Sequence, residues 1–504
     1  MLESALSALS HLASPMTFLA LTGGVLIGMV SGAMPGGGVP GLVILLGFAY
    51  HMDPWIAIPL AIGMWATVPT TDTIPAVLLG IPGSTSGQAT ILDGHAMARK
   101  GQAGVALAAA YFGSLVGGLL GAIFLVLTLP IARPLVNQFG SAEFFIMGLV
   151  TIAVVGVLSS GAVYKGLAAG ALGLLISTIG FDTINGVPRA TFGQAFLFDG
   201  IPLVPMIVGL FAIPELIDLV INDTPIARQR FESLLADTNK GRREGIMAVI
   251  HNWGVVVQST IIGIIIGVMP GIGGSLANWL TYAQARQSVK DGIRTFGTGD
   301  VRGVIAPETA NNAVDGGDLL PTLGFGVPGS VGMALFMGFL IILGYQPGPP
   351  MINNNMDVLL GIAFSLAIAN VMATGLGLLF TPQIARIALV RPNVLVPIVL
   401  AVLMLSAFQA NASMWDLILV LIAAGLGFFM KTYGWPRPPI IIAIVMGDLI
   451  EKYYFLAATN YGWSLFTRPA VIVMLVFTAA MVIYTLRLQM QARKAGAVVG
   501  VDDD

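Results

Sequence analysis

The sequence contains no cysteine and few charged residues, and both shortages exclude whole classes of protein. Without Cys, the chain can form neither disulfides nor Cys-ligated zinc or iron–sulfur sites. Charged residues make up 10% of the 504 residues, whereas soluble domains average about 25%. With a hydrophobic fraction of 56%, this composition excludes a disordered chain and an ordinary water-soluble domain.

Several enzyme motifs and any sign of nucleic-acid binding are also missing. The four His residues are far apart, and there is no HExxH, GxxxxGK[ST] or GxSxG sequence. Nothing therefore supports a zinc protease, a P-loop ATPase or a common serine hydrolase. The net charge is −2 and no basic block occurs, which argues against nucleic acid as a partner. We expect a protein that is not an enzyme and carries no cofactor.

Long apolar runs are abundant instead. They recur along nearly the whole chain, and each can cross the hydrocarbon core of a bilayer as a helix. The sequence therefore predicts an all-α polytopic membrane protein with about 10–12 transmembrane segments. Gly is enriched, at 63 residues, which favours close helix packing or broken helices. The apolar segments are 17–34, 40–50, 54–68, 74–92, 103–130, 142–158, 163–180, 200–220, 253–269, 272–285, 323–345, 357–382, 391–410, 414–430, 438–459 and 469–487.

Two motifs occur twice, in the same order. GxxxGxxPG begins at Gly28 and again at Gly263, 235 residues later. DxxPxxxxGxPGS begins at Asp72 and again at Asp318, 246 residues later. Either motif alone is weak evidence in a Gly-rich chain, but the ordered pair indicates an internal duplication. We expect a first repeat at 1–220 with its motif core at 20–130, a linker at 221–252, a second repeat at 253–487 with its core at 250–345, and a tail at 488–504.

The distribution of basic residues predicts that the two repeats are inverted. In the first copy, residues 51–71 before the PGS motif lack Lys and Arg, and Arg99 and Lys100 follow it. In the second copy the order reverses, since 286–302 is basic and 331–385 has no Lys or Arg. Basic residues mark cytoplasmic loops. We therefore expect a periplasmic N-terminus, a cytoplasmic linker and tail, and the inverted repeats typical of secondary transporters.

The Pro-Gly-Ser sequences predict two helix breaks that could bind an anion. Freed backbone groups cannot face lipid and must line a cavity. Ser can cap the helix that follows, and the N-terminus of that helix favours a carboxylate. A pair of packing kinks is the alternative. The predicted substrate-binding residues are Pro82, Gly83, Ser84, Thr85, Ser86, Pro328, Gly329, Ser330, Asn311 and Asn312.

Acidic residues next to the breaks predict a cation site. Carboxylates inside a membrane are costly, and a functional role is their default interpretation. Clustered carboxylates, amides and free carbonyls suit Na⁺ or a proton relay. The alternative is that 307–318 forms a loop at the inner surface. The predicted cation-binding residues are Asp72, Asp315, Asp318, Thr71, Gly36 and Gly271, with Na⁺ as the candidate metal ion.

Three long strings in the two motif cores carry a family resemblance. They are LLGIPGSTSGQATILDGHAMARKGQAGVALAAA, GVMPGIGGSLANWLTYAQARQSVKDG and FGTGDVRGVIAPETANNAVDGGDLLPTLGFGVPGS. The chain resembles the large membrane subunit of tripartite tricarboxylate transporters, the TctA type. The likeness implies a multi-pass protein of the bacterial inner membrane that imports citrate-like tricarboxylates or other organic acids by cation symport. It also implies two partners, a small four-span membrane subunit and a periplasmic solute-binding protein.

Other interpretations stay open beside this one. A stand-alone carboxylate carrier or an ion channel could contain the same hairpins. An intramembrane aspartyl protease using Asp72 and Asp318 is weaker, because each acid lies beside a transporter-like Pro-Gly break. The hairpin pattern is similar to that of elevator-type dicarboxylate carriers, but only at the level of the fold. A homo-oligomer is compatible with every one of these alternatives.

Overall fold

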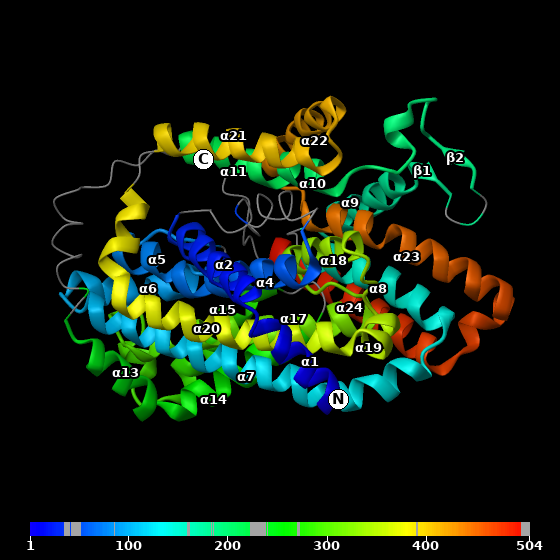
Figure 1. The fold of residues 1–504 in the computed structure, drawn as a ribbon. Helices are drawn as coiled ribbons and strands as arrows, with labels where there is room; N and C mark the ends of the chain where they lie inside the picture. The colour runs from blue at the N-terminus through cyan, green and yellow to red at the C-terminus, as the bar shows by residue number, and fades with distance from the viewer. Residues whose placement is uncertain are drawn as a thin grey trace.

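The protein is almost entirely helical, as Figure 1 shows. The computed structural model describes residues 1–34, 41, 52–84, 86–158, 162–182, 184, 186–221, 238, 240–269, 273–389 and 392–494. In this part of the chain the strands form one small antiparallel sheet, in which β1 (Gly180–Phe181) pairs with β2 (Pro188–Arg189). The all-α class predicted from the sequence is confirmed.

The described part of the first half of the chain contains twelve labelled helical elements. They are α1 (Leu2–Leu12), α2 (Pro15–Ala33), α4 (Pro54–Thr71), α5 (Thr73–Leu79), α6 (Gln88–Arg99), α7 (Ala103–Gln138), α8 (Ser141–Leu158), α9 (Val163–Ser177), the 3₁₀ turn η1 (Ala195–Leu197), α10 (Leu203–Ile207), and α11 (Ile213–Ile221), which a π-helical turn, η2 (Val208–Ala212), joins to α10.

The second half of the described chain is also helical. Its elements are α13 (Arg242–His251), α14 (Trp253–Val268), α15 (Gly273–Ser288), α16 (Gly292–Thr295), α17 (Arg302–Phe325), α18 (Val331–Ile342), α19 (Pro349–Asn354), α20 (Met356–Ala385), η3 (Arg386–Leu389), α21 (Pro392–Asn411), α22 (Met414–Thr432), α23 (Pro438–Tyr461), η4 (Gly462–Thr467) and α24 (Pro469–Lys494). The two longest helices, α7 and α20, lie side by side across the molecule (Figure 1).

Six helices in the described residues are long and apolar enough to cross a membrane. The count becomes seven if α13 and α14, which meet at a 75° bend, form one broken span. The larger number predicted from the sequence would also need shorter apolar helices, such as α8, α9 and α18, and it stays a prediction. The six helices are α2, α7, α10–α11, α20, α22 and the apolar part of α24.

Two apolar segments predicted as single runs are each divided by a backbone reversal. Segment 74–92 divides into α5 and α6, and segment 323–345 divides into the end of α17 and α18. The helices before the reversals end at Gly80 and Gly326, whose φ values of 70° and 71° are left-handed. Only Gly adopts this conformation without a steric cost. The predicted segment 40–50 lies almost wholly outside the described residues.

Glycines of the GxxxGxxPG motif let a neighbouring helix pack closely against α2 and against α14. In both copies, a Cβ added to either glycine would lie within 2.7 Å of a carbonyl oxygen of the neighbouring helix. The oxygens belong to Met64 for Gly28, Val68 for Gly32, Ala310 for Gly263 and Val314 for Gly267. The two partners in the second copy lie 246 residues after those in the first. The duplicated motifs therefore make equivalent contacts.

Candidate functional site

The two breaks share one geometry. Each Gly cap N–H donates to the carbonyl of a proline five residues earlier, from Gly80 to Pro75 and from Gly326 to Pro321. The chain then reverses through Pro-Gly-Ser and enters a second helix. We call α5 and α6, with their connection, the first hairpin. We call the part of α17 after Asp318, together with α18, the second hairpin.

At the first hairpin, the reversal brings the Pro-Gly-Ser residues back against a buried acid. Asp72 lies between α4 and α5 with a fully buried side chain. The Ser84 hydroxyl donates to its Oδ2 atom, while Oδ1 has no hydrogen-bond partner. A Cβ at Gly83 would be 2.7 Å from the Asp72 carbonyl oxygen, so only Gly fits against this acid without a shift. The tip residues thus enclose the carboxylate predicted to bind a cation.

The second hairpin repeats this arrangement. Asp318 lies inside α17 and is 3% exposed. A Cβ at Gly329 would be 2.0 Å from its Oδ1 atom, which has no hydrogen-bond partner. An orphaned carboxylate oxygen in a buried site is costly. Each hairpin tip therefore presents one unpaired acceptor oxygen, as a cation site would require.

The predicted helix caps occur at one tip only. Ser330 is the N-cap of α18, and its side chain accepts a hydrogen bond from the Met333 N–H at 3.2 Å. For Ser84 the prediction is wrong, because α6 begins only at Gln88 and its N-cap, Gly87, makes no side-chain bond. Ser84 instead bonds Asp72 and accepts from the Ser86 N–H at 3.1 Å. The physical reason is the longer connection between this tip and its second helix.

Replacement of each serine by alanine should therefore have different effects. Ser330→Ala should cost about 0.5–2 kcal/mol of stability, the usual value of a lost N-cap. Ser84→Ala removes the donor to Asp72 and should change cation dependence more than the melting temperature. Thermal unfolding and uptake at varied cation concentration separate the two. Equal melting temperatures for wild type and Ser330→Ala would contradict the assigned cap.

The acid- and amide-rich stretch of α17 runs between the two tips. Every residue from Gly303 to Leu319 is buried inside a helix, so the alternative of an inner-surface loop at 307–318 is wrong. Asp315 accepts a 3.0 Å hydrogen bond from the Trp65 indole, and its Oδ2 has no partner. Acid and amide side chains therefore share the protein interior with the breaks.

The predicted amides face α4 and α20. Asn312 donates to the Thr70 hydroxyl at 3.0 Å and to the Asn370 side chain at 2.7 Å. Asn311 donates to the Pro69 carbonyl at 3.4 Å. The side-chain oxygen of Asn312, Oδ1, has no hydrogen-bond partner. Thr71, predicted as a cation ligand, bonds the carbonyls of Thr67 and Gly28.

The first tip also meets α15. The Asn278 amide donates to the Ser86 carbonyl at 2.7 Å. A Cβ at Gly274 would lie 3.0 Å from the Ser86 hydroxyl and 3.5 Å from Asn311 Oδ1. The structure thus brings Ser86 and Asn311 to one place. The predicted residues Gly36, Thr85 and Gly271 lie outside the described residues.

The electrostatics of this interior are one-sided. Asp72, Glu308, Asp315 and Asp318 are all buried, yet no buried side chain in the described residues belongs to Lys or Arg. The same residues contain no group of three His, Asp or Glu able to hold a metal ion. A single site shared by three carboxylates is therefore not formed. Each tip instead contributes one buried carboxylate beside its backbone reversal.

Among the buried acids missed at the sequence level, two lie within the strings that carry the resemblance. Glu308 is fully buried in α17 and accepts hydrogen bonds from hydroxyls of three other helices. Asp93 is fully buried in α6. Their partners lie about 200 residues away in the chain, so no local spacing could have identified them. The only available signal was an acid within an apolar surrounding.

Asp93 ties the first hairpin to the basic segment 286–302. Its carboxylate accepts backbone hydrogen bonds from Gly297, Gly299 and Asp300 at 2.7–3.0 Å, and one from the Tyr282 hydroxyl at 2.9 Å. Burial opposes ionisation of Asp300, but hydrogen bonds from Arg302 and Thr295 outweigh it and lower the pKa of that carboxyl. The hydrogen bonds of Asp93 to this segment anchor the base of the first hairpin.

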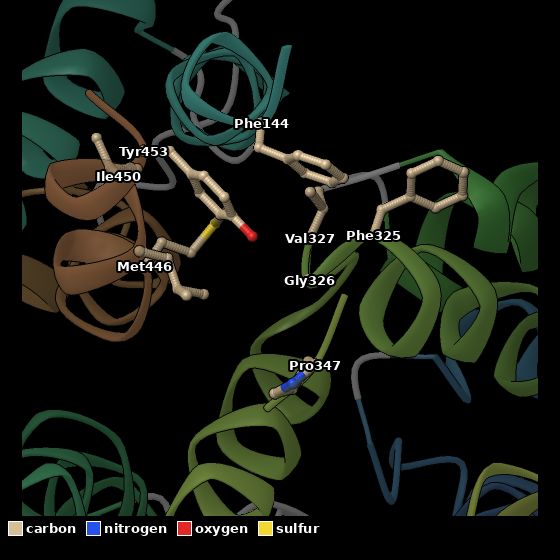
Figure 2. A pocket seen from close by; sticks show the side chains of 9 residues that line it. Phe144, Phe325, Gly326, Val327, Pro347, Met446, Ile450 and Tyr453 are labelled. Carbon is tan, nitrogen blue, oxygen red and sulfur yellow. The ribbon is translucent and has the colours of Figure 1, made fainter. Parts of the chain in front are cut away.

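A small pocket lies behind the second hairpin, between its Gly326 turn and helices α8 and α23 (Figure 2). Phe144 stacks on Tyr453 at one side, with ring centroids 5.0 Å apart. Phe325, Met446 and Ile450 also line the pocket. None of the described residues that line it is charged, so this pocket does not suit a carboxylate.

Comparison with known proteins gives the family. The family model described as "Tripartite tricarboxylate transporter TctA family" matches residues 18–442. One relative is the "Uncharacterized 52.8 kDa protein in TAR-I ttuC' 3'region" of Agrobacterium vitis, 30% identical over 441 residues, which are 85% of this chain and 84% of that protein. Another is the "Uncharacterized protein in TAR-II ttuC' 3'region" of Agrobacterium vitis, 28% identical over 191 residues, 38% of this chain and 78% of that protein.

No solved structure matches the chain. The family model covers both hairpins and the helices that carry the buried acids, from α2 to the start of α23. The chain therefore belongs to the TctA family, the membrane component of tripartite tricarboxylate transporters, and is a multi-pass transporter subunit rather than an enzyme.

Proposed function

We propose that this protein is the permease that imports citrate-like tricarboxylates or related organic acids by symport with Na⁺ or H⁺. The observation that carries the proposal is the pair of hairpin tips, each with a buried carboxylate, an orphaned oxygen and no buried cation. A tricarboxylate adds up to three negative charges, and a helix N-terminus offers only about half a positive charge. A co-transported cation would offset this charge and use the membrane potential.

The substrate would bind between the tips. In this proposal the backbone of Pro82–Ser86 and of Pro328–Ser330, with Asn311 and Asn312, binds the carboxylates. Asp72 and Asp318 bind the cation, assisted by Asp315, Thr71 and the Gly breaks at Gly36 and Gly271. Na⁺ is preferred over H⁺ at these tips because free backbone carbonyls suit oxygen coordination. The unpaired oxygens of Asp72 and Asp318 support this assignment.

The test is uptake of labelled citrate and related acids into proteoliposomes. The permease would be reconstituted with its small four-span partner subunit, with and without the periplasmic binding protein and a Na⁺ gradient. The expected result is uptake that requires both the binding protein and the Na⁺ gradient in addition to the small subunit. Equal uptake without the binding protein would instead favour the second candidate, a stand-alone carrier or channel. Absence of uptake of every organic acid would refute the proposal.

The proposed orientation places the two repeats antiparallel in the inner membrane, with a periplasmic N-terminus and a cytoplasmic C-terminus. The equivalent contacts of the duplicated motifs support a duplication, and the basic segment 286–302 supports its direction. On this basis the domains are the repeats 1–220 and 253–487, joined by the linker 221–252. Motion of the two hairpins together as an elevator is part of the same proposal.

Cysteine labelling tests this orientation without interference, because the chain has no native Cys. Lys240→Cys should react with a membrane-impermeant reagent only after the cytoplasmic side is opened. Ser10→Cys, exposed on α1, is the matched control and should react from outside. The reverse pattern would contradict the orientation.

A further inference from the structure

Glu308 holds both arms of the first hairpin against α17. Its side chain is fully buried. Thr73 of α5 donates a hydrogen bond to Oε2 at 2.6 Å, and Thr90 of α6 donates to Oε1 at 2.5 Å. Ser114 of α7 is 3.5 Å from Oε2. One carboxyl group thus joins the helix entering the tip, the helix leaving it and the long helix behind them.

In the part of the chain that the structure describes, no Lys or Arg side chain bonds this carboxyl group, whose partners are hydroxyls. The ionisable groups on which Glu308 acts electrostatically are another acid, Asp72, and the Tyr111 hydroxyl of α7. Helices α2, α4, α14 and α18 contain no ionisable side chain. Arg242 of α13 acts electrostatically on Tyr111. Two other groups are hydrogen-bonded elsewhere: the Tyr282 hydroxyl of α15 donates to Asp93 of α6, and a ring nitrogen of His95 of α6 bonds the Val77 carbonyl.

This environment suits a proton better than a metal ion. Removing a charged carboxylate from water without a cationic partner costs far more free energy than burying the neutral acid. The Thr73 and Thr90 oxygens lie at hydrogen-bond distance from the carboxyl oxygens. Oxygens at hydrogen-bond distance leave room for a hydrogen but not for a metal ion directly between them. A bound proton neutralises Glu308 and keeps the hydrogen bonds.

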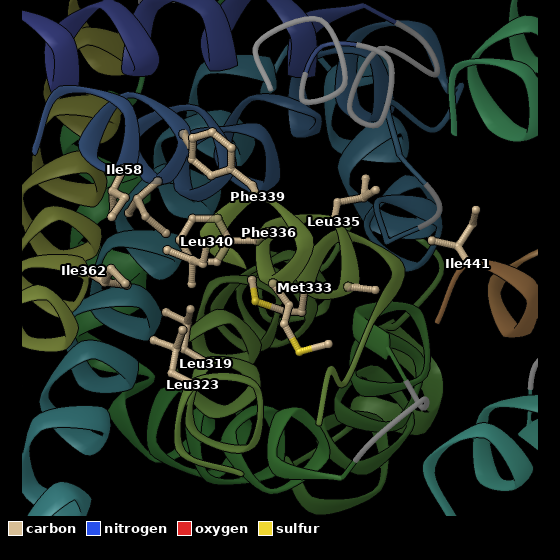
Figure 3. Close-up of a cluster of buried hydrophobic side chains, with 14 of the residues drawn as sticks. Ile58, Leu319, Leu323, Met333, Leu335, Phe336, Phe339, Leu340, Ile362 and Ile441 are labelled. Carbon is tan, nitrogen blue, oxygen red and sulfur yellow. The ribbon is translucent and has the colours of Figure 1, made fainter. Parts of the chain in front are cut away.

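The second copy shows that this contact does not need polar residues. At the fixed spacing of 246, Glu308 corresponds to Ile62 and Thr73 to Leu319, and both are fully buried apolar residues. The buried residues of α18 are also apolar or Gly. Figure 3 shows Leu319, Met333 and Phe336 together in this apolar core. Packing alone would be served by such residues, so the polar group at the first hairpin needs a different reason.

We propose that Glu308 is a proton-binding site that couples protonation to the position of the first hairpin. The neutral acid fits the dry, closed contact with Thr73 and Thr90. Loss of the proton leaves a buried charge that has hydroxyl donors but no bonded cation, which favours movement of the hairpin away from α17. Its part in a transport cycle rests on the proposed function, whereas the proton site does not. It is separate from the cation sites proposed at the tips.

Infrared spectroscopy of the purified full-length protein in lipid nanodiscs tests this site. The wild-type spectrum minus that of Glu308→Gln should contain one carboxylic-acid C=O band at acidic pH, lost as the pH rises. Thr90→Val should shift that band because a hydrogen bond is lost, and Thr90→Ser should restore it. Glu143→Gln is the matched control: Glu143 is paired with Arg468, so its removal should leave the acid band unchanged. If Glu308→Gln does not fold, the Thr90 pair supplies the readout.

Two results would overturn the assignment. One is an acid band that is the same in wild type and Glu308→Gln at every pH. The other is removal of the band by Na⁺ at constant pH, which would make Glu308 a metal ligand. A titrating band in a protein that carries no organic acid would leave the proton site standing and remove the proposed function. Uptake of an organic acid by a protein that shows no such band would support the proposed function and remove the proton site.

Discussion

Asp318→Asn is expected to abolish gradient-driven uptake of the organic acid while the protein still reaches the membrane in normal amount. Asparagine keeps the size of the side chain but removes the charge that would bind the coupled cation. The unpaired Oδ1 of Asp318 lies directly against Gly329 at the second tip. No buried Lys or Arg in the described chain could replace that cation. The measurement is uptake into proteoliposomes over a range of Na⁺ concentrations and pH values.

Asp72→Asn should behave in the same way, because Asp72 occupies the equivalent place at the first tip. Asp416→Asn is the matched control, since Asp416 is a buried acid in α22, outside both hairpins. It should retain uptake with ordinary cation dependence. Unchanged cation dependence in both Asp72→Asn and Asp318→Asn would mean that these acids are structural. The cation would then have to bind elsewhere.

The sequence predicted the breaks well because their causes are local. Pro and Gly act on their own stretch of backbone, so the spacing DxxPxxxxGxPGS was sufficient to place a reversal after Asp72 and after Asp318. The structure has left-handed Gly80 and Gly326 at equivalent points. The motif glycines could likewise be recognised, since the backbone contacts of Gly28 and Gly263 depend only on the absence of a side chain.

What the sequence could not give depends on contacts between distant segments. Glu308 lies 235 residues from Thr73 and 218 from Thr90, and nothing along the chain signals that these three side chains meet. The capping error at Ser84 has a similar origin. The motif is identical at both tips, but α18 begins directly after Ser330, whereas α6 begins four residues after Ser84. The residues that follow the motif, rather than the motif itself, decide whether the serine caps a helix.

Alanine substitutions of the two tip glycines, Gly83 and Gly329, provide a second test with a large expected effect. The two substitutions should impair the protein for different reasons. A Cβ at Gly83 would be 2.7 Å from the Asp72 carbonyl oxygen and 2.8 Å from its Cα. Backbone atoms cannot turn away, so Gly83→Ala should force the tip apart. We expect a loss of about 1–3 kcal/mol in stability, the usual cost of overpacking, together with loss of uptake.

Gly329→Ala should instead leave the melting temperature near that of wild type. The atom that its Cβ would meet, at 2.0 Å, is the end of the Asp318 side chain, and a carboxylate can rotate away. Rotation moves the proposed cation ligand, so the apparent cation affinity should fall about tenfold or more, which corresponds to about 1.4 kcal/mol. Thermal unfolding and cation-dependent uptake, measured on the same samples, separate the two variants.

Gly375→Ala is the matched control for both substitutions. Gly375 lies within α20, and nothing is found within 4 Å of a Cβ built there. This variant should match wild type in melting temperature and in uptake. If Gly329→Ala acts by moving Asp318, adding it to Asp318→Asn should cause no further loss, because residues that act as a unit are not additive. Wild-type cation dependence in Gly329→Ala would show that the carboxylate beside this glycine is not where the cation binds.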